Sequence, residues 1–280
     1  MTIKQYLDYA TKELENSNIA TARLDALVLM EFFLNIDRSK LLAYQNDQLL
    51  TERQKNVLNR VLKKRSMHIP ISYITHNTEF YGRNFYIDNN VLEPRPESET
   101  IIDLYKRVVL SDDVISKKIR SQEKIRVADI GTGSGALGIT IALEDINSLV
   151  DLVDIDKKAI RIAKRNVVFH TINVRCFLAD LIPNTHYVHD VFVCNLPYIP
   201  DSFNINLAAS HEPHIAIFGG YDGLELYRKL FKTMDLLQHN PLYIITESLP
   251  LSHPQLKLIA ETNGYKLALA EDFVQVFKKY

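Results

Sequence analysis

The chain is poor in cysteine, and its apolar runs are short. Both cysteines, Cys176 and Cys194, lie in apolar runs, so we expect reduced core residues and exclude a disulfide framework. No uncharged apolar run approaches the ~18 residues that a membrane-spanning helix needs. The first residues, Met1 to Gln5, lack the apolar core of a signal peptide. The sequence therefore predicts a cytoplasmic protein with no membrane partner.

Net charge and metal-ligand patterns are also lacking. The 33 basic and 34 acidic residues leave a net charge of −1, which gives no general attraction to nucleic acid or to an acidic membrane. The histidines show no metal-ligand spacing with cysteine or with one another. The pair His211 and His214 falls in a predicted loop. We therefore expect no metal site and no strong nucleic-acid binding.

The first 68 residues carry helical patterns only. Apolar residues recur at helical spacing from Ile3 to Leu14, and the segment from Leu24 to Phe33 is apolar almost all round. The second pattern predicts a largely buried helix. Two further helices are indicated by their caps: Asp37 before Leu41, Leu42 and Tyr44, and the capping box of Thr51 with Gln54. We expect residues 1–70 to form a small helical domain that recognises the substrate.

A β-rich segment and a proline-rich segment follow Pro70. Residues 71–92 are rich in β-forming side chains and are broken at Asn77 and Gly82, which predicts a strand or hairpin between two domains. We place this β-hairpin linker at residues 71–96. Arg95 lies between two prolines that favour an extended backbone, and Glu97 follows it. These charges are suited to line a cleft at the start of a helix that runs to Val108.

From residue 125 onward, strand and helix patterns alternate. This alternation predicts a parallel, doubly wound sheet in a domain of residues 97–280. The expected strands are 125–130, 149–155, 174–178, 190–194 and 242–246, and the expected helices are 136–143, 157–169, 224–237 and 252–262, with a long loop at 199–222. Two last strands, 265–270 and 273–277, are joined only by Glu271 and Asp272. Because so short a link cannot hold a parallel crossover, this pair must be antiparallel.

Candidate ligand-binding residues stand at the ends of successive predicted strands. After the first strand comes a glycine-rich turn that lets a ligand approach the backbone closely, with the residues Gly131, Thr132, Gly133, Ser134 and Gly135. Asp154 ends the second strand, where a carboxylate can accept hydrogen bonds from both hydroxyls of a ribose. Asp180, followed by Leu181, comes after the third, where it can accept from an adenine amino group. Because ligands bind outside the carboxyl ends of parallel strands, we expect a nucleoside site here.

The fourth predicted strand ends in Asn195-Leu196-Pro197-Tyr198. An amide oxygen, a proline that fixes φ and a flat aromatic face can together hold a planar group that bears nitrogen. Two details favour S-adenosylmethionine over NAD as the cofactor. Asp129 precedes a wide Gly-x-Gly-x-Gly turn, and hydride transfer has no need of this tetrapeptide. NAD stays an alternative, because the turn followed by Ala136 also fits the dinucleotide fingerprint.

With these residues, the chain resembles the class I S-adenosylmethionine-dependent methyltransferases and, more narrowly, the HemK/PrmC family of release factor glutamine methyltransferases. The likeness covers most of the chain, and its most specific parts are Pro94-Arg95-Pro96-Glu97 and Glu212-Pro213 followed by Gly219-Gly220-Tyr221-Asp222-Gly223-Leu224. It implies a Rossmann-like doubly wound methyltransferase sheet with a final antiparallel strand, preceded by a small all-α domain. It also implies methylation of the side-chain amide of the Gln in the Gly-Gly-Gln loop of class I peptide release factors, and so a role in translation termination.

The resemblance and the chemistry of an amide together assign roles to the site. An amide nitrogen is a poor nucleophile because its lone pair is delocalised. If Asn195 and the carbonyl of Leu196 accept its two hydrogens, the lone pair is aimed at the methyl group. We expect Asn195, Pro197 and Tyr198 to be catalytic, and Leu196 to bind substrate with them. The other expected contacts are Arg95, Glu97 and Glu212 to the substrate, and the glycine turn, Asp154, Asp180, Leu181 and Asn195 to S-adenosylmethionine, which leaves as S-adenosylhomocysteine from a monomeric enzyme.

The sequence departs from the family pattern at Leu196, which replaces the usual first proline. Asn-Leu-Pro-Tyr is the form seen in ribosomal RNA adenine dimethylases, so an adenine amino group is the first alternative substrate. Those enzymes carry their extra helical domain after the catalytic domain, whereas here it comes first. A glutamine of a ribosomal protein is another alternative. An inactive methyltransferase-like binding module is disfavoured, because Gly131, Gly133, Asp154, Asn195 and Tyr198 are all present.

Overall fold

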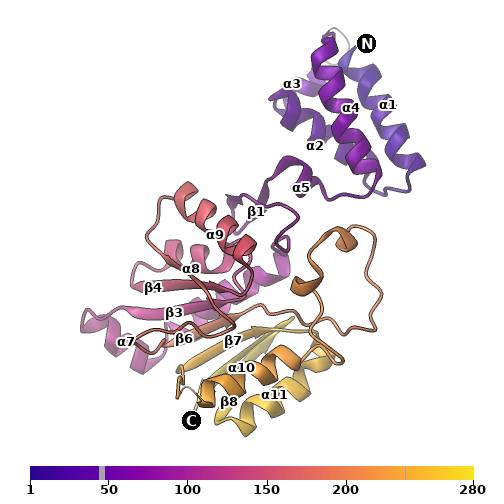
Figure 1. Cartoon of the computed structure of the whole chain (residues 1–280). Helices are drawn as coiled ribbons and strands as arrows, with labels where there is room; N and C mark the ends of the chain where they lie inside the picture. Colours follow the sequence, from indigo (N-terminus) through magenta and orange to yellow (C-terminus); the bar gives the residue numbers. More distant parts are fainter. Residues whose placement is uncertain (44–47, 237) are drawn as a thin grey trace. The chain divides into compact units, whose positions relative to one another are not determined.

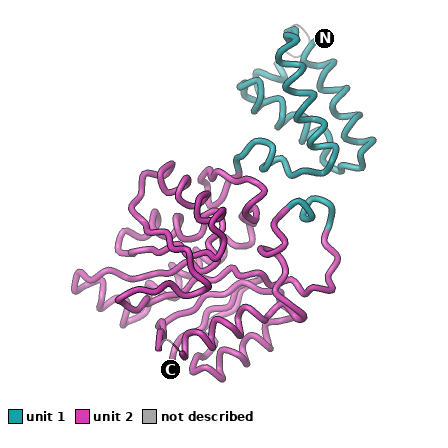
Figure 2. Tube along the Cα trace, viewed as in Figure 1, with its two compact units in different colours: residues 1–77, 206–211 teal, residues 78–205, 212–280 magenta. Residues whose placement is uncertain are grey.

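The structure is a computed structural model that describes residues 1–43, 48–236 and 238–280. The chain divides into two compact units (Figure 2). The first, here called the helical unit, comprises Met1–Asn77 and Asn206–His211, and the second, the sheet unit, comprises Thr78–Ile205 and Glu212–Tyr280. The predicted helix position Tyr44 and the predicted helix end Leu237 lie outside the described residues.

The helical unit contains the helices α1 (Ile3–Asn16), α2 (Ala22–Leu34), α3 (Arg38–Ala43), α4 (Glu52–Ser66) and α5 (Ile71–Thr75). The predicted capping box of Thr51 and Gln54 is confirmed at the start of α4. Asp37 caps α3 as predicted, since its carboxylate accepts from the backbone N–H of Lys40 at 3.0 Å. The two caps supply acceptors for backbone N–H groups that have no partner inside the helix.

Helix α2 is less buried than its apolar sequence predicts. Leu24 and Phe32 are 48% and 46% exposed, so the expectation of a largely buried helix is wrong for one side of it. Helices α1, α4 and α5 cover the other side, where Asp25 is buried and its carboxylate pairs with Arg65 at 2.7 Å. A unit of so few helices has too few elements to cover α2 all round.

Residues 71–75 form helix α5, so the predicted strand is wrong for this stretch. Pro70 precedes the helix, and its carbonyl accepts from the N–H groups of Tyr73 and Ile74 at 3.1 and 3.2 Å. Ile74 packs against Leu29 and Val61 in the helical unit. Burial against two helices has therefore outweighed the β-propensity of this segment. The hairpin itself is present, as β1 (Thr78–Phe80) paired antiparallel with β2 (Arg83–Phe85).

The sheet unit is built on seven strands in the order β5-β4-β3-β6-β7-β9-β8 (Figure 1). The strands are β3 (Ile125–Ile130), β4 (Ser148–Asp154), β5 (Arg175–Leu178), β6 (Val191–Cys194), β7 (Tyr243–Glu247), β8 (Tyr265–Glu271) and β9 (Val274–Lys279). The first five are parallel, and β9 inserts antiparallel between β7 and β8. The predicted Rossmann-like sheet with a final antiparallel strand is therefore confirmed.

Helices cover both faces of this sheet. One core joins the sheet to α6 (Glu99–Leu104), α7 (Asp113–Arg120), α8 (Ala136–Glu144) and α9 (Lys157–Phe169). The other joins it to α10 (Glu225–Leu236) and α11 (His253–Thr262). Short turns complete the path: η1 (Pro96–Ser98), the π-helical η2 (Tyr105–Val109), η3 (Ala209–His211), η4 (His214–Ala216) and η5 (Pro250–Ser252). No helix in the described ranges has both the length and the apolar character needed to span a bilayer.

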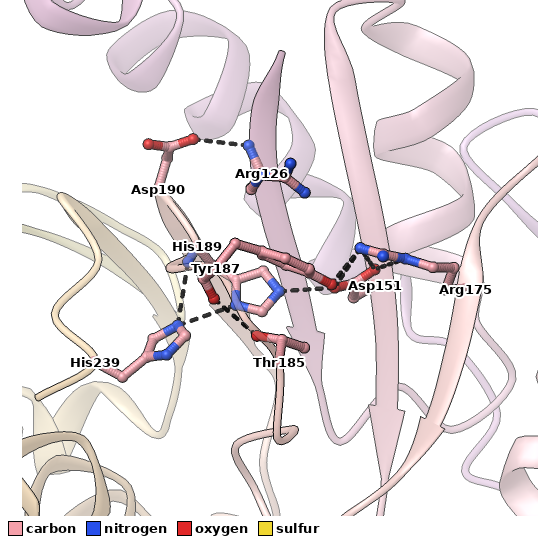
Figure 3. A network of polar contacts seen from close by, with 8 residues as sticks. All are labelled: Arg126, Asp151, Arg175, Thr185, Tyr187, His189, Asp190 and His239. Atoms are coloured by element: carbon pink, nitrogen blue, oxygen red, sulfur yellow. Dashed lines mark hydrogen bonds and ion pairs between the residues drawn. The ribbon is translucent and has the colours of Figure 1, made fainter. Parts of the chain in front are cut away.

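A partly buried polar network links β4 and β5 to the segments before β6 and β7 (Figure 3). Asp151 on β4 accepts from Arg175 on β5 at 2.9 Å and from the hydroxyl of Tyr187 at 2.6 Å, and its carboxylate lies 2.8 Å from Nε2 of His189. His239 in turn accepts from the backbone N–H of His189 at 3.1 Å. Burial by itself would raise the pKa of Asp151, but hydrogen bonds from His189 and Tyr187 and the charge of Arg175 lower it. Asp151 therefore stays ionised in the sheet interior.

We expect Asp151→Ala to lower the free energy of unfolding of the sheet unit by about 3 kcal/mol, because it leaves buried partners uncompensated. Urea unfolding followed by circular dichroism measures this loss. Asp235→Ala is the matched control, since Asp235 is exposed on α10. Equal midpoints for the two variants would contradict a stabilising role for the network.

Candidate active site

A cavity of about 210 Å³ lies at the carboxyl ends of the parallel strands. Its wall includes residues 131–134 of the glycine turn after β3, Asp154 at the end of β4, Asp180 and Leu181 after β5, and Asn195, Leu196 and Pro197 after β6. Gly135, the last residue of the turn, does not line it. Other parts of the wall come from the segment before α6 (Asn90, Val91, Leu92, Pro94 and Ser98), from Pro213, Ile215 and Ala216, and from α10. The sheet thus brings together the candidate cofactor residues that the sequence places at separate strand ends.

The glycine turn leaves space for a ligand beside its backbone. Gly133 has a φ of +54°, and a Cβ built there would meet no atom within 4 Å. Gly131 is tighter, because a Cβ at this position would lie 3.0 Å from Cδ2 of Leu196. A side chain at either position would be strained by the positive φ. Only Gly133 opens onto free space, and it is there that the backbone can be approached closely.

The carboxylate of Asp129 stabilises this turn by hydrogen bonds. Its Oδ2 atom accepts from the hydroxyl of Thr132 at 2.5 Å and from the N–H of Gly138 at 2.9 Å. Oδ1 has no hydrogen-bond partner in the described part of the chain. Burial raises the pKa of Asp129 to about 6, against the hydrogen bonds from Thr132 and Gly138, which lower it. The carboxyl group is therefore half protonated near pH 6 in the folded protein.

We expect Asp129 to make stability fall as the pH rises from about 4 to about 7. The pKa is raised from 3.8 to about 6, so in this window the folded state binds more protons than the unfolded state. The shift corresponds to about 3 kcal/mol. Asp129→Asn keeps an acceptor oxygen for Thr132 and Gly138 but cannot ionise. The free energy of unfolding of this variant should therefore not fall by this amount as the pH rises. Urea unfolding of both proteins at several pH values measures the difference. A constant difference between them across this range would show that Asp129 does not titrate there.

Asp154 links the turn to β4. Its two carboxylate oxygens accept from the N–H of Gly133 and the N–H of Asp156, each at 2.9 Å. Asp154 lines the cavity, and each of its oxygens can accept a further hydrogen bond. Burial raises the pKa of Asp154, and the two backbone N–H groups oppose that rise. The acceptor capacity left at this position fits the two hydroxyls of a ribose.

Asp180 lines the cavity but is already paired. Its carboxylate forms an ion pair with Lys229 of α10, and about half of each side chain is exposed. Lys229 lines the same cavity. Leu181, next to Asp180, is buried and has a φ of +67°. An adenine amino group at Asp180 would therefore share this carboxylate with Lys229.

The tetrapeptide after β6 is held by contacts on both sides. The side-chain nitrogen of Asn195 donates to Oγ of Ser98 at 2.9 Å, which leaves the amide oxygen as the free acceptor of that group. Leu196 is 3% exposed and packs against Gly131. The hydroxyl of Tyr198 donates to Oε1 of Glu247 at 2.9 Å. Asn195, Leu196 and Pro197 line the cavity, whereas Tyr198 lies outside its wall.

Arg95 and Glu212, both predicted to contact the substrate, form an ion pair with each other. The carboxylate of Glu212 accepts from Arg95 at 2.5 Å and from the N–H of Glu93 at 3.4 Å. Burial raises the pKa of Glu212, and the charge of Arg95 lowers it. This ion pair ties the segment before η1 to the segment after residue 211. Arg95, Glu97 and Glu212 do not line the cavity.

Two residues of this site, Ser98 and Glu247, are absent from the sequence prediction of site residues. Ser98 lies at the end of η1, and Glu247 is the last residue of β7, fully buried. The predicted strand 242–246 stops one residue short of Glu247. The sequence could have indicated Glu247, because a polar residue at the carboxyl end of a parallel strand is a candidate ligand residue. The described residues contain no group of three or more side chains that could hold a metal ion.

Comparisons with known proteins agree with this geometry. The profile described as PrmC N-terminal domain matches residues 5–75, and the profile described as Methyltransferase small domain matches residues 106–211. The release factor glutamine methyltransferase of Bacillus cereus is 36% identical over 72% of this chain and 70% of its own length. That of Koribacter versatilis is 34% identical over 82% of this chain and 80% of its own length.

A longer relative also matches. The bifunctional methyltransferase of Rickettsia typhi is 32% identical over 82% of this chain, but the match spans only 47% of its length. The sheet order and the cavity at the strand ends define a methyltransferase of the Rossmann-like class. Within that class, the chain belongs to the release factor glutamine methyltransferase family.

Proposed function

We propose that this protein transfers a methyl group from S-adenosylmethionine to the side-chain amide nitrogen of the Gln in the Gly-Gly-Gln motif of class I peptide release factors. The observation that carries the proposal is the orientation of Asn195. The side-chain nitrogen of Asn195 donates to Oγ of Ser98, and Asn195 lines the cavity. The amide oxygen is thereby available to a substrate amide. The names of the relatives, release factor glutamine methyltransferase, support the substrate.

The residues at the strand ends fit S-adenosylmethionine. The open space beside Gly133 accepts the ligand close to the backbone, flanked by Thr132 and Ser134 of the same turn. Asp154 has acceptor capacity for the ribose hydroxyls, and Asp180 with Leu181 borders the place for adenine. When bound, S-adenosylmethionine supplies a methyl group that the positive charge on sulfur has already activated. A strong general base is therefore not needed.

The substrate side is formed by Asn195 to Tyr198. The oxygen of Asn195 and the carbonyl of Leu196 accept the two hydrogens of the substrate amide, which aims the nitrogen lone pair at the methyl group. Pro197 keeps the turn rigid, and Tyr198 stacks on the planar amide. The substrate also contacts Arg95, Glu97 and Glu212, which do not line the cavity. Arg95 and Glu212 are already paired with each other.

We extend the proposal to the rest of the chain. Residues 1–70 are the substrate-recognition domain, 71–96 the linker and 97–280 the methyltransferase domain. The match of residues 5–75 to the PrmC N-terminal domain supports a dedicated role for the first of these segments. The enzyme acts in the cytoplasm as a monomer, where release factors terminate translation.

A competition experiment tests the substrate. The protein is incubated with radiolabelled S-adenosylmethionine, and a release factor, ribosomal proteins and ribosomal RNA are offered in the same reaction. We expect the label in the release factor. Label in ribosomal RNA alone would favour an adenine amino group, and label in a ribosomal protein alone would favour a different glutamine substrate; either result overturns the proposal.

A further inference from the structure

Glu247 is an acidic residue that the methyl-transfer scheme above does not use. It ends β7, is 0% exposed and neighbours the tetrapeptide of Asn195 to Tyr198. A buried carboxylate is costly unless hydrogen bonds compensate it. Its placement beside the residues proposed to hold the substrate therefore calls for a role.

One carboxylate oxygen of Glu247 contacts a side chain that is proposed to hold the substrate. Oε1 accepts from the hydroxyl of Tyr198 at 2.9 Å. Oε2 makes no hydrogen bond of good geometry within the described ranges. Burial raises the pKa of Glu247, whereas hydrogen bonding from Ser98, Tyr198 and Asn195 lowers it. Ser98 and Asn195 are themselves joined at 2.9 Å. The hydrogen bonds therefore form two pairs, Tyr198 with Glu247 and Asn195 with Ser98.

The backbone under these two pairs is also held firmly. The hydroxyl of Tyr227 donates to the carbonyls of Glu247 and Cys194, at 2.5 and 3.1 Å. Cys194 ends β6 directly before Asn195, and Tyr227 is fully buried on α10. One phenol therefore joins the ends of β6 and β7, so Glu247 keeps a constant position relative to the tetrapeptide.

We propose that Glu247 is a positioning residue for methyl transfer: its carboxylate accepts from the hydroxyl of Tyr198 and thereby fixes the Tyr198 ring beside the substrate amide. The expected effect on kcat rests on the proposed function. Residues that must hold a substrate amide within a few tenths of an ångström need supporting contacts of this kind. Glu247 acts through Tyr198 and does not touch the substrate.

A double-mutant cycle tests the role. Glu247→Gln keeps the shape of the side chain and removes its charge, and Tyr198→Phe removes only the hydroxyl. We expect Glu247→Gln to lower kcat by roughly 10-fold to 100-fold, because a hydrogen bond to a charged group is weakened. The KM and Kd for S-adenosylmethionine should stay within about twofold. The double variant should be much less impaired than the product of the two single effects, since the two residues share one interaction.

The controls separate this role from a purely structural one. Glu261→Gln, on the exposed side of α11, should leave kcat unchanged. Rates are expressed per folded molecule, so that a loss of stability alone would not lower kcat. Effects of Glu247→Gln and Tyr198→Phe that multiply independently, or a kcat for Glu247→Gln within twofold of the parent protein, would overturn the proposal.

A crystal structure of Glu247→Gln makes the test independent of the substrate. We expect a displaced Tyr198 side chain relative to a crystal structure of the parent protein. A Tyr198 side chain in an unchanged position would overturn the positioning role even if the release factor were not the substrate. A parent protein that fails to methylate the release factor would overturn the proposed function alone.

Discussion

Replacing Asn195 by alanine is expected to reduce methyl transfer roughly 1000-fold, to near the background of the assay, while the Kd for S-adenosylmethionine changes only a few fold. The loss follows from the geometry, because the amide nitrogen of Asn195 is anchored on Ser98 and its oxygen is the acceptor on the cavity wall. Removal of one preorganised group that stabilises a transition state costs about 100-fold to 1000-fold. The Asn195→Ala protein still has the glycine turn and Asp154. Transfer of labelled methyl groups and titration calorimetry measure the two quantities.

The matched control is Asn173→Ala. Asn173 is exposed and precedes β5, at the opposite end of the sheet from the cavity. Its kcat and its Kd for S-adenosylmethionine should equal those of the parent protein. Normal turnover by the Asn195→Ala protein would exclude a role for Asn195 in holding the substrate amide. A loss of cofactor binding as large as the loss of rate would show that Asn195 serves the cofactor instead.

Asp154→Ala should weaken S-adenosylmethionine binding about 100-fold or more. Two hydrogen bonds to a carboxylate are each worth about 1.5–3 kcal/mol, and about 1.4 kcal/mol corresponds to a tenfold change in Kd. The substitution also removes the acceptor for the N–H of Gly133 at 2.9 Å, which holds the open part of the turn. Calorimetry gives the Kd directly.

Two further variants sharpen this test. Asp154→Asn keeps one oxygen acceptor and loses the charge, so its Kd should fall between those of the parent protein and Asp154→Ala. Asp235→Ala removes an exposed carboxylate of α10 and should leave the Kd unchanged. An unchanged affinity in Asp154→Ala would refute the assignment of this residue to the ribose.

The architecture of the sheet unit could be predicted from local patterns. Buried parallel strands appear in the sequence as short apolar runs, such as Val191 to Cys194. The predicted link of Glu271 and Asp272, which is Asp272 and Phe273 in the structure, is too short for a crossover, and β8 and β9 are indeed antiparallel. The position of β9 between β7 and β8 does not follow from that link, because a hairpin can join a sheet by either strand.

The predictions from sequence are wrong where contacts between residues far apart in the chain decide the local structure. Ile71 to Thr75 has the side chains of a strand, but packing of Ile74 on Leu29 and Val61 favours a helix. Contacts between distant residues also limit what the sequence predicts about the site. The cavity-lining turn and strand ends were predictable because all parallel strands end at one edge. The hydrogen bonds from Asn195 to Ser98 and from Tyr198 to Glu247 join segments far apart in the sequence, so no local pattern indicates them.

The most direct test of the proposed activity is to locate the transferred methyl group. A class I release factor is incubated with the protein and S-adenosylmethionine, digested, and sequenced by tandem mass spectrometry. We expect one added methyl group on the side-chain amide of the Gln in the Gly-Gly-Gln motif, and none in a reaction with Asn195→Ala. A methyl group on any other residue, or no methylation of the release factor by an enzyme that methylates ribosomal RNA, would contradict the account.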